Sequence, residues 1–152
     1  MELELHETIE KAKHLYEREA TIWCPYFSAP VTLNADGFNH LQYKANRQPR
    51  IVAEQLLKLR LLKKALLIIR KAGTLQEYRR LVETVGKRNR DGFFKTKEVE
   101  YWGFHAIVGS EKQIKIVVVI RRVGDGKIIF WSVLPHRKFN QQKLYTEGIE
   151  DD

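Results

Sequence analysis

The chain of 152 residues is 43% hydrophobic and 30% charged, which fits one globular domain able to bury its own core. Its one cysteine, Cys24, excludes an intramolecular disulfide, and no paired-cysteine motif or histidine cluster predicts a zinc site. No apolar run is long enough for a membrane span, and the acidic start differs from a signal peptide. We therefore expect a cytoplasmic protein with no metal, no cofactor and no membrane partner.

The charge is distributed unevenly along the sequence. The formal net charge is +8, but residues 1–20 carry six acidic against three basic residues, and residues 146–152 carry four acidic and none basic. Residues 21–145 hold 24 basic against nine acidic residues. Such a basic body attracts polyanions, so it predicts a nucleic-acid partner unless the charge serves solubility alone. We place a single domain at residues 1–145 and an acidic tail with little fixed structure at 146–152. This tail is either an inert end or a segment that dwells on the basic surface and competes with phosphates.

The start of the chain predicts a helix and then a short extended segment. Apolar residues at helical spacing indicate an amphipathic helix over residues 3–19. Two prolines and an Asp-Gly pair follow, so we expect Val31–Asn34 to be extended and to end in a turn. The next stretch, FNHLQYKANRQPR, is polar and basic and is interpreted as a connector.

The middle of the chain contains the clearest helix. Over Arg50–Lys71, apolar residues step by three and four and cover most of the circumference, so this helix should be central and buried. Gly73 is a natural stop for it, and Thr74 can cap a second helix that ends near Gly86.

The last third predicts an antiparallel meander. Lys97–Val108, Gln113–Arg122 and Lys127–Leu134 are rich in β-branched and aromatic residues and are separated by glycine turns. The centre of the middle strand, Ile114–Ile120, is apolar at nearly every position, which predicts cover on both faces. The fold class is therefore α+β, with N-terminal helices packed on a C-terminal antiparallel sheet of at least three strands.

Most enzyme signatures are missing from the sequence. It has no glycine-rich phosphate loop, no paired-cysteine motif and no nucleophile elbow, and the carboxylates of the basic body lack the spacing of a magnesium site. Cleavage of nucleic acid by this chain would therefore use a histidine and basic groups on a ribose 2′-hydroxyl.

His40 is the best candidate for an acid-base group. It lies in the polar connector among basic residues, whose charge would lower its pKa and keep it neutral; a loop histidine bonded to the backbone is the alternative. His136, beside two further basic residues, is a second acid-base candidate or a plain surface residue. His105 is interpreted as a packed residue of the sheet.

A phosphate site on the sheet is a further hypothesis. Arg121 ends the middle strand and Ser132 lies within the next, and together they could hold a phosphate, although Ser132 could equally be a small packing residue. Trp131 invites base stacking, with core packing as the alternative. The basic residues assigned to nucleic-acid binding are Lys44, Arg47, Arg50, Arg60, Lys64, Lys87 and Arg88.

Three stretches resemble a known family: LNADGFNHLQYK, QIKIVVVIRR and GKIIFWSVLP. With helices preceding a curved antiparallel sheet, they are similar to the barnase/EndoU/colicin/RelE-like (BECR) ribonuclease-toxin superfamily, in particular its phage and mobile-element branches. In that superfamily a histidine, basic residues and a serine or threonine on the sheet line the RNA site. The resemblance implies these roles for His40, Lys44, Arg50, Arg121 and Ser132.

The leading hypothesis is a metal-independent endoribonuclease-like domain, a toxin or phage-associated effector that acts on RNA in preference to DNA. His40 would be the general base, Arg121 and Ser132 would complete the catalytic site, and a cognate inhibitor protein would be a partner. The alternatives are a non-catalytic nucleic-acid-binding module and a phage-encoded structural or partner-binding protein.

Overall fold

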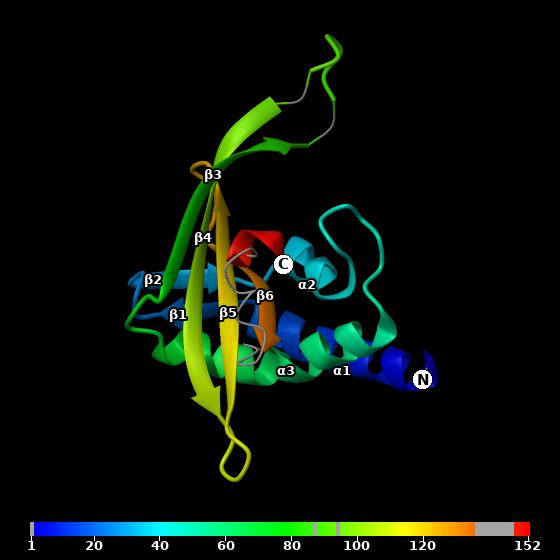
Figure 1. Ribbon diagram of the computed structural model, residues 1–152, viewed down its shortest axis with the longest axis vertical. Helices are drawn as coiled ribbons and strands as arrows, with labels where there is room; N and C mark the ends of the chain where they lie inside the picture. Colours follow the sequence, from blue (N-terminus) through cyan, green and yellow to red (C-terminus); the bar gives the residue numbers. More distant parts are fainter. Residues whose placement is uncertain (1, 87, 94, 136–147) are drawn as a thin grey trace.

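The computed structural model describes residues 2–86, 88–93, 95–135 and 148–152. Within these residues, helices lie against a curved six-stranded sheet (Figure 1), so the predicted α+β class is confirmed. The elements in chain order are α1 (Glu2–Glu19), β1 (Thr21–Cys24), β2 (Ala29–Thr32), α2 (Ala35–Gln42), α3 (Val52–Lys71), β3 (Glu77–Val85), β4 (Lys95–Val108), β5 (Ile114–Val123), β6 (Ile129–Pro135) and the 3-10 helix η1 (Ile149–Asp151).

The sheet has the strand order β1-β2-β6-β5-β4-β3. The predicted meander is its centre, because β4, β5 and β6 pair antiparallel in succession. The β1–β2 hairpin joins this meander through one parallel pairing, Thr32 with Ile129, so the first part of the chain completes a sheet built mainly by the last.

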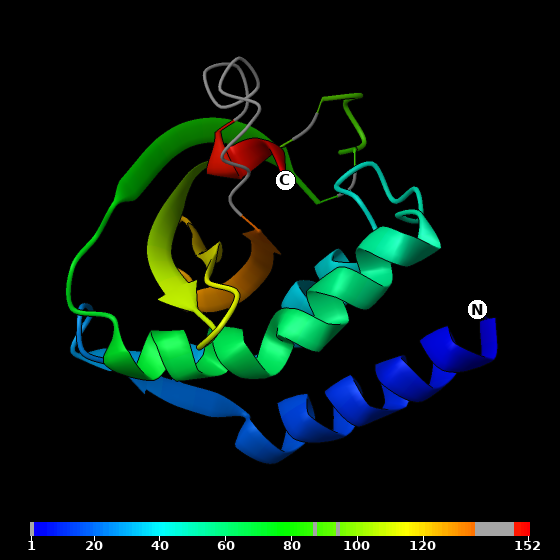
Figure 2. The ribbon, with the colours of Figure 1, turned by 60° about the horizontal axis from the view of Figure 1, so that its bottom comes forward.

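The helices cover one face of the sheet. The predicted central helix is α3, which lies between α1 and the strands (Figure 2) and buries Leu62, Ala65 and Ile69 completely. These side chains join the large apolar cluster between the helices and the sheet. None of the helices in the described ranges has the length and apolar character needed to cross a membrane.

Strand β5 is covered on both faces, as its apolar sequence predicts. Ile116, Val118 and Ile120 belong to the cluster beneath the helices, whereas Val117 and Val119 belong to a second cluster on the opposite face. All five are at most 2% exposed. The unbroken apolar run therefore reflects two cores that share one strand.

The prediction of a polar connector after the first extended segment is wrong for its first half. Residues 35–42 form the helix α2 instead. The side chain of Asn34 caps this helix by accepting a hydrogen bond from Gly37 N at 3.0 Å. Phe38 and Leu41, three residues apart, are buried on its inner side, and His40 therefore lies on a helix rather than in a loop.

The predicted second helix after Gly73 is also wrong, because residues 77–85 form β3. This strand pairs with β4 along its whole length, from Glu77 opposite Gly103 to Val85 opposite Lys95. The two strands project beyond the rest of the sheet as an arm (Figure 1). Long-range strand pairing outweighs the local helix signal here, as tertiary context commonly does.

Residues 148–152 have a defined place, although the sequence assigns them to a tail with little fixed structure. They form η1, and the side chain of Ile149 is 4% exposed within the second apolar cluster. An added Cβ on Gly103 would lie 3.3 Å from Ile149, which shows how closely the segment meets β4. The other tail residues, 146 and 147, lie outside the described residues.

Candidate functional site

Five polar side chains from distant parts of the chain meet beneath α2. Four of them are at most 4% exposed, and the fifth, an aspartate, has an 11% exposed side chain. They come from α2, the residue pair before α3, α3 itself, β6 and the end of the 148–152 segment. We call them the buried polar cluster: His40, Arg50, Lys58, Ser132 and Asp152.

The donors of this cluster converge on the carboxylate of Asp152. Lys58 Nζ donates to its two oxygens at 3.0 and 2.9 Å, and also to Ser132 Oγ and the Val133 carbonyl at 3.0 Å. Ser132 Oγ donates to Asp152 Oδ2, and an Arg50 nitrogen lies 3.8 Å from the same oxygen. Cationic and hydroxyl donors therefore surround one anionic group.

His40 is held beside this anion by Arg50 and Trp131. Arg50 Nε donates to the backbone carbonyl of His40 at 3.0 Å, and Arg50 Nη2 lies 3.2 Å from His40 Nε2. Because a guanidinium only donates, this contact makes Nε2 the unprotonated ring nitrogen. The imidazole stacks on Trp131 at 3.9 Å between ring centroids, and Nε2 lies 4.0 Å from Asp152 Oδ2.

The electrostatics of the cluster keep His40 neutral. Burial, reinforced by the charge of Arg50, lowers the pKa of His40 to about 4, although Asp152 opposes the change. Burial likewise lowers the pKa of Lys58, against the opposing pull of Asp152. Burial alone would raise the pKa of Asp152, but Lys58 and the hydrogen bond from Ser132 bring it below its usual range.

A register shift between β5 and β6 sets the directions in which the side chains of β6 point. Ser132 pairs with Val119 and Phe130 pairs with Ile120, so Trp131 is an extra residue without a partner on β5. Such a bulge redirects side chains relative to simple alternation. Here Trp131 turns to His40, and Ser132 reaches Lys58 on α3.

The helix α2 reaches β6 because Gly37 has no side chain. A Cβ at Gly37 would collide with the Phe130 carbonyl oxygen and would lie 2.9 Å from Tyr16 Oη. Tyr16 Oη in turn donates to the Asn34 carbonyl at 2.6 Å, just before α2. This close approach brings His40, one turn further along α2, to the edge of the cluster.

Arg121 lies next to the cluster but does not join it. Its guanidinium lies 4.1 Å over Trp131 and 3.4 Å from Glu83, and no contact with Ser132 is found within the described part of the chain. The Nε of Arg121 is buried and has no hydrogen-bond partner among the described residues. Of the three predicted catalytic residues, His40 and Ser132 therefore lie in the same cluster, whereas Arg121 lies outside it, against the ring of Trp131.

The basic residues predicted to bind nucleic acid separate into groups. Arg50 is part of the cluster, whereas Lys44 and Arg47 are exposed in the connector between α2 and α3. Arg60 is paired with Glu4 on α1, away from the cluster. Arg88 belongs to the turn of the β3–β4 arm.

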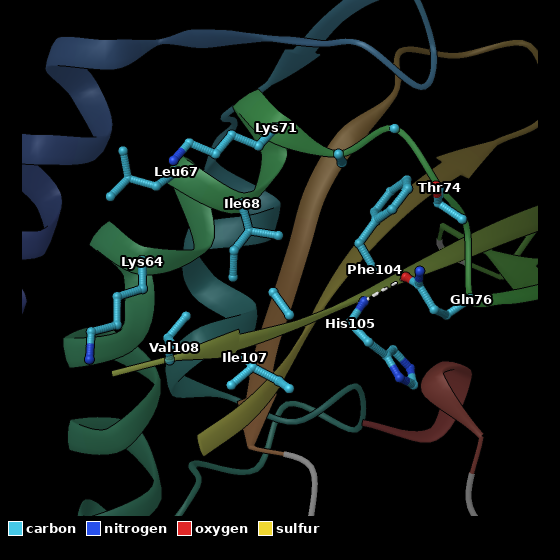
Figure 3. A pocket seen from close by; sticks show the side chains of 13 residues that line it. Lys64, Leu67, Ile68, Lys71, Thr74, Gln76, Phe104, His105, Ile107 and Val108 are labelled. Atoms are coloured by element: carbon cyan, nitrogen blue, oxygen red, sulfur yellow. Dashed lines mark hydrogen bonds between the residues drawn. The ribbon is translucent and has the colours of Figure 1, made fainter. Parts of the chain in front are cut away.

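Lys64 lines a separate pocket of about 450 Å³ between the end of α3 and β4 (Figure 3). Lys71, Phe104 and Ile107 line it too, and none of its lining residues belongs to the buried polar cluster. His105 also lies at this pocket and contacts Glu77 at 2.7 Å, in keeping with its expected place in the sheet. Two predicted residues, Lys87 and His136, lie outside the described residues.

Sequence reasoning missed two members of the cluster. Lys58 could have been found from the sequence, because it lies four residues before Leu62 and therefore on the buried side of α3. A charged side chain in such a position is rarely stable without an ion-pair or hydrogen-bond partner. The sequence predicts that the acidic tail is either inert or in contact with the basic surface, but no signal singles out Asp152, because it is one of several acidic residues there and its partner Lys58 is 94 residues away.

No group of three or more potential metal ligands occurs among the residues that the structure describes. Comparisons of the chain with protein-family models, with curated proteins and with solved structures gave no match. The chemistry of the buried polar cluster is therefore the basis for assigning a function.

Proposed function

We propose that the protein is a metal-independent endoribonuclease-like domain whose site is the buried polar cluster. One observation carries the proposal: the donors of Lys58, Arg50 and Ser132 surround an anionic oxygen that lies 4.0 Å from a neutral histidine nitrogen. A base, two cations and a hydroxyl donor around one anion are the groups that RNA cleavage through the 2′-hydroxyl requires.

A phosphodiester has the chemistry to take the place of the carboxylate. Both groups carry one negative charge and offer two oxygens to donors at hydrogen-bond distance. Lys58 and Arg50 would then bind the non-bridging oxygens, where charge grows in the transition state, and Ser132 would orient the group. Arg121, whose guanidinium lies over Trp131, would contact the neighbouring nucleotide.

The proposed reaction moves two protons and exchanges one bond at phosphorus. Once Arg50 Nη2 turns from the ring to the phosphate, His40 Nε2 accepts the proton of the 2′-hydroxyl, and the 2′-oxygen forms a bond to phosphorus as the bond to the 5′-oxygen breaks. Lys58, made a stronger acid by its lowered pKa, gives a proton to the departing 5′-oxygen. The products are a 2′,3′-cyclic phosphate and a 5′-hydroxyl end.

The charge of the molecule supports an RNA substrate over a small anion. The exposed connector that carries Lys44 and Arg47 runs directly between His40 and Arg50, so a strand in the site would pass beside both cations. The net charge of +8 raises the local concentration of polyanions around the domain.

The test incubates purified protein with total RNA in EDTA and analyses the RNA ends. We expect cyclic phosphate ends from the wild type and a loss of about 10²–10⁴ in rate for His40→Ala and for Lys58→Met. His14→Ala, on the exposed side of α1, is the matched control and should cleave normally. Intact RNA at high protein concentration, or full cleavage by His40→Ala, would overturn the mechanism.

The burial of the cluster favours a second candidate, a nucleic-acid-binding module without catalysis. His40 and Ser132 are 4% and 0% exposed, as in a site that neutralises charge without admitting substrate. In that case the same variants would bind RNA as the wild type does, and no RNA ends would appear in any sample.

A further inference from the structure

Residues 148–152, which we call the strap, place one carboxylate in the buried polar cluster. Lys58 Nζ donates to both oxygens of Asp152, Ser132 Oγ donates to one, and Arg50 lies 3.8 Å from it. The side chain of Asp152 is 11% exposed, so solvent has little access to these donors while the strap is in place. The atoms that the proposed ribonuclease site would offer to a phosphate are therefore already engaged.

Two side chains are the main anchors of the strap in this position. Ile149 is buried against β4 near Gly103, and Asp152 is bound by the cluster. Between them runs a single 3-10 turn, closed by the hydrogen bond from Asp151 N to the Gly148 carbonyl. A turn of this kind has little stability of its own, so the position of the strap depends on those two anchors.

A weaker contact of the strap is the ion pair between Glu150 and Arg79. Arg79 Nε lies 3.6 Å from Glu150 Oε2, and this buried oxygen accepts no hydrogen bond from the described residues. The side chain of Arg79 is 44% exposed, so the pair adds little to the stability of the closed position. The strap is thus held by few contacts, and those of Ile149 and Asp152 are the main ones.

We propose that the strap is an autoinhibitory element: the carboxylate of Asp152 fills the phosphate subsite, and a phosphodiester enters when the strap leaves. The inference rests on the proposed function, because the subsite is the one assigned there to RNA. The exchange is electrostatically balanced, since one singly charged oxygen anion replaces another beside Lys58 and Arg50. Neither the closed nor the substrate-bound state leaves the buried ammonium without an anion.

The test compares two variants that each remove one carboxylate from the strap. Asp152→Ala removes the group in the cluster, whereas Asp151→Ala removes the neighbouring carboxylate, which contacts Gly148 of the strap itself. Binding of inorganic phosphate is measured by calorimetry, and cleavage of an RNA oligonucleotide is measured in EDTA. Ile149→Ser, which removes the apolar anchor but leaves the cluster intact, provides a second way to open the strap if Asp152→Ala does not fold.

We expect Asp152→Ala and Ile149→Ser to bind phosphate more tightly than the wild type and Asp151→Ala. If the strap is closed about 99% of the time, the gain in affinity is about a hundredfold, because the apparent affinity scales with the fraction of open sites. Equal phosphate affinity in all four proteins would overturn the strap proposal, whatever they do to RNA.

The two proposals fail in different ways. Tighter phosphate binding by Asp152→Ala without RNA cleavage by any protein would support the strap as the occupant of an anion site and reject the ribonuclease. Equal cleavage by the wild type and Asp152→Ala, together with equal phosphate binding, would support the ribonuclease and reject the strap.

Discussion

His40 combines a helical position with an environment that removes its charge. Its ring stacks on the indole of Trp131 and contacts Arg50 through Nε2, and Asp152 Oδ2 lies 4.0 Å from that nitrogen. A histidine held neutral in this way can accept a proton at pH 7, which an imidazolium cannot do. The neutral state also makes the stability of the fold depend on pH.

The first prediction concerns that pH dependence. The pKa of His40 is about 4 in the folded chain and near 6.5 in the unfolded one, so the unfolded chain binds this proton first as the pH falls. Stability that is fully present above pH 6.5 is therefore lost between pH 6.5 and 4, by about 3 kcal/mol at 1.4 kcal/mol for each pKa unit.

Urea unfolding at a series of pH values measures this loss, and NMR of the imidazole protons reports the folded pKa directly. His40→Gln should remove the same part of the pH dependence, because glutamine does not titrate. An imidazole that titrates near 6.5 in the folded protein would contradict the neutral, buried base.

Lys58 and Asp152 differ in what each can do when its partner is removed. Lys58 is fixed on α3 with 2% exposure, whereas Asp152 belongs to a segment held by few anchors. The second prediction follows: Asp152→Ala lowers the free energy of unfolding by about 3 kcal/mol, because the ammonium stays buried without a counter-ion. Lys58→Met costs less, because the carboxylate can swing into water.

A double-mutant cycle by urea unfolding in chloride buffer measures the pair. The combination of Lys58→Met and Asp152→Ala should recover most of the loss caused by Asp152→Ala alone, because no unpaired charge remains. If Lys58→Met is as costly as Asp152→Ala or costlier, the strap is not free to leave.

At the scale of elements, α2 is placed by its contact with β6. Gly37 allows this helix to approach the Phe130 carbonyl, and the approach sets the position of His40 relative to the cluster. The bulge at Trp131 supplies the facing surface on β6. The site therefore depends on the fit between two elements whose sequences give no direct sign of one another.

The third prediction tests this fit with a pair of glycine variants. Gly37→Ala should lower the free energy of unfolding by about 1–3 kcal/mol, the range for overpacking, and should reduce RNA cleavage by displacing His40. Gly73→Ala is the control, because an added Cβ there meets nothing within 4 Å and the new residue only restricts the unfolded chain. Thermal unfolding and RNA cleavage rates measure both effects, and equal behaviour of the two variants would contradict the close packing of α2.

At the scale of the whole molecule, the basic residues are not equivalent. The net charge of +8 acts on any polyanion at a distance, but contact with phosphates needs cations that are exposed and unpaired near the site. The connector from α2 to α3 is exposed and carries Lys44 and Arg47, whereas Arg60 is already paired with Glu4.

The fourth prediction separates these groups by salt dependence. For single-stranded RNA, the double variant Lys44→Ala with Arg47→Ala should weaken binding and reduce the slope of log K against log salt by about 1.4, or about 0.7 for each phosphate contact. Arg60→Ala should leave the slope unchanged. Binding measured by fluorescence anisotropy over a series of salt concentrations tests this, and a flat salt dependence of the wild type would argue against nucleic acid as the partner.

The sequence by itself determined the elements whose signal is local. The helix at Val52–Lys71 and the meander of β4, β5 and β6 are visible because burial on one face repeats with the period of the element. The unbroken apolar run of β5 likewise indicates two covered faces, and the uneven charge indicates a basic body.

Only the tertiary structure decided the elements and contacts that depend on distant residues. The segment at residues 77–85 is a strand because β4 pairs with it. Residues 35–42 form α2 where a connector was predicted, because this segment packs on β6 and Tyr16 binds the residue before it. Lys58 and Asp152 meet across 94 residues, a separation over which no periodic pattern carries information. Local periodicity reports which side of an element is buried, but the identity of the partner across the core depends on the packing of the whole chain.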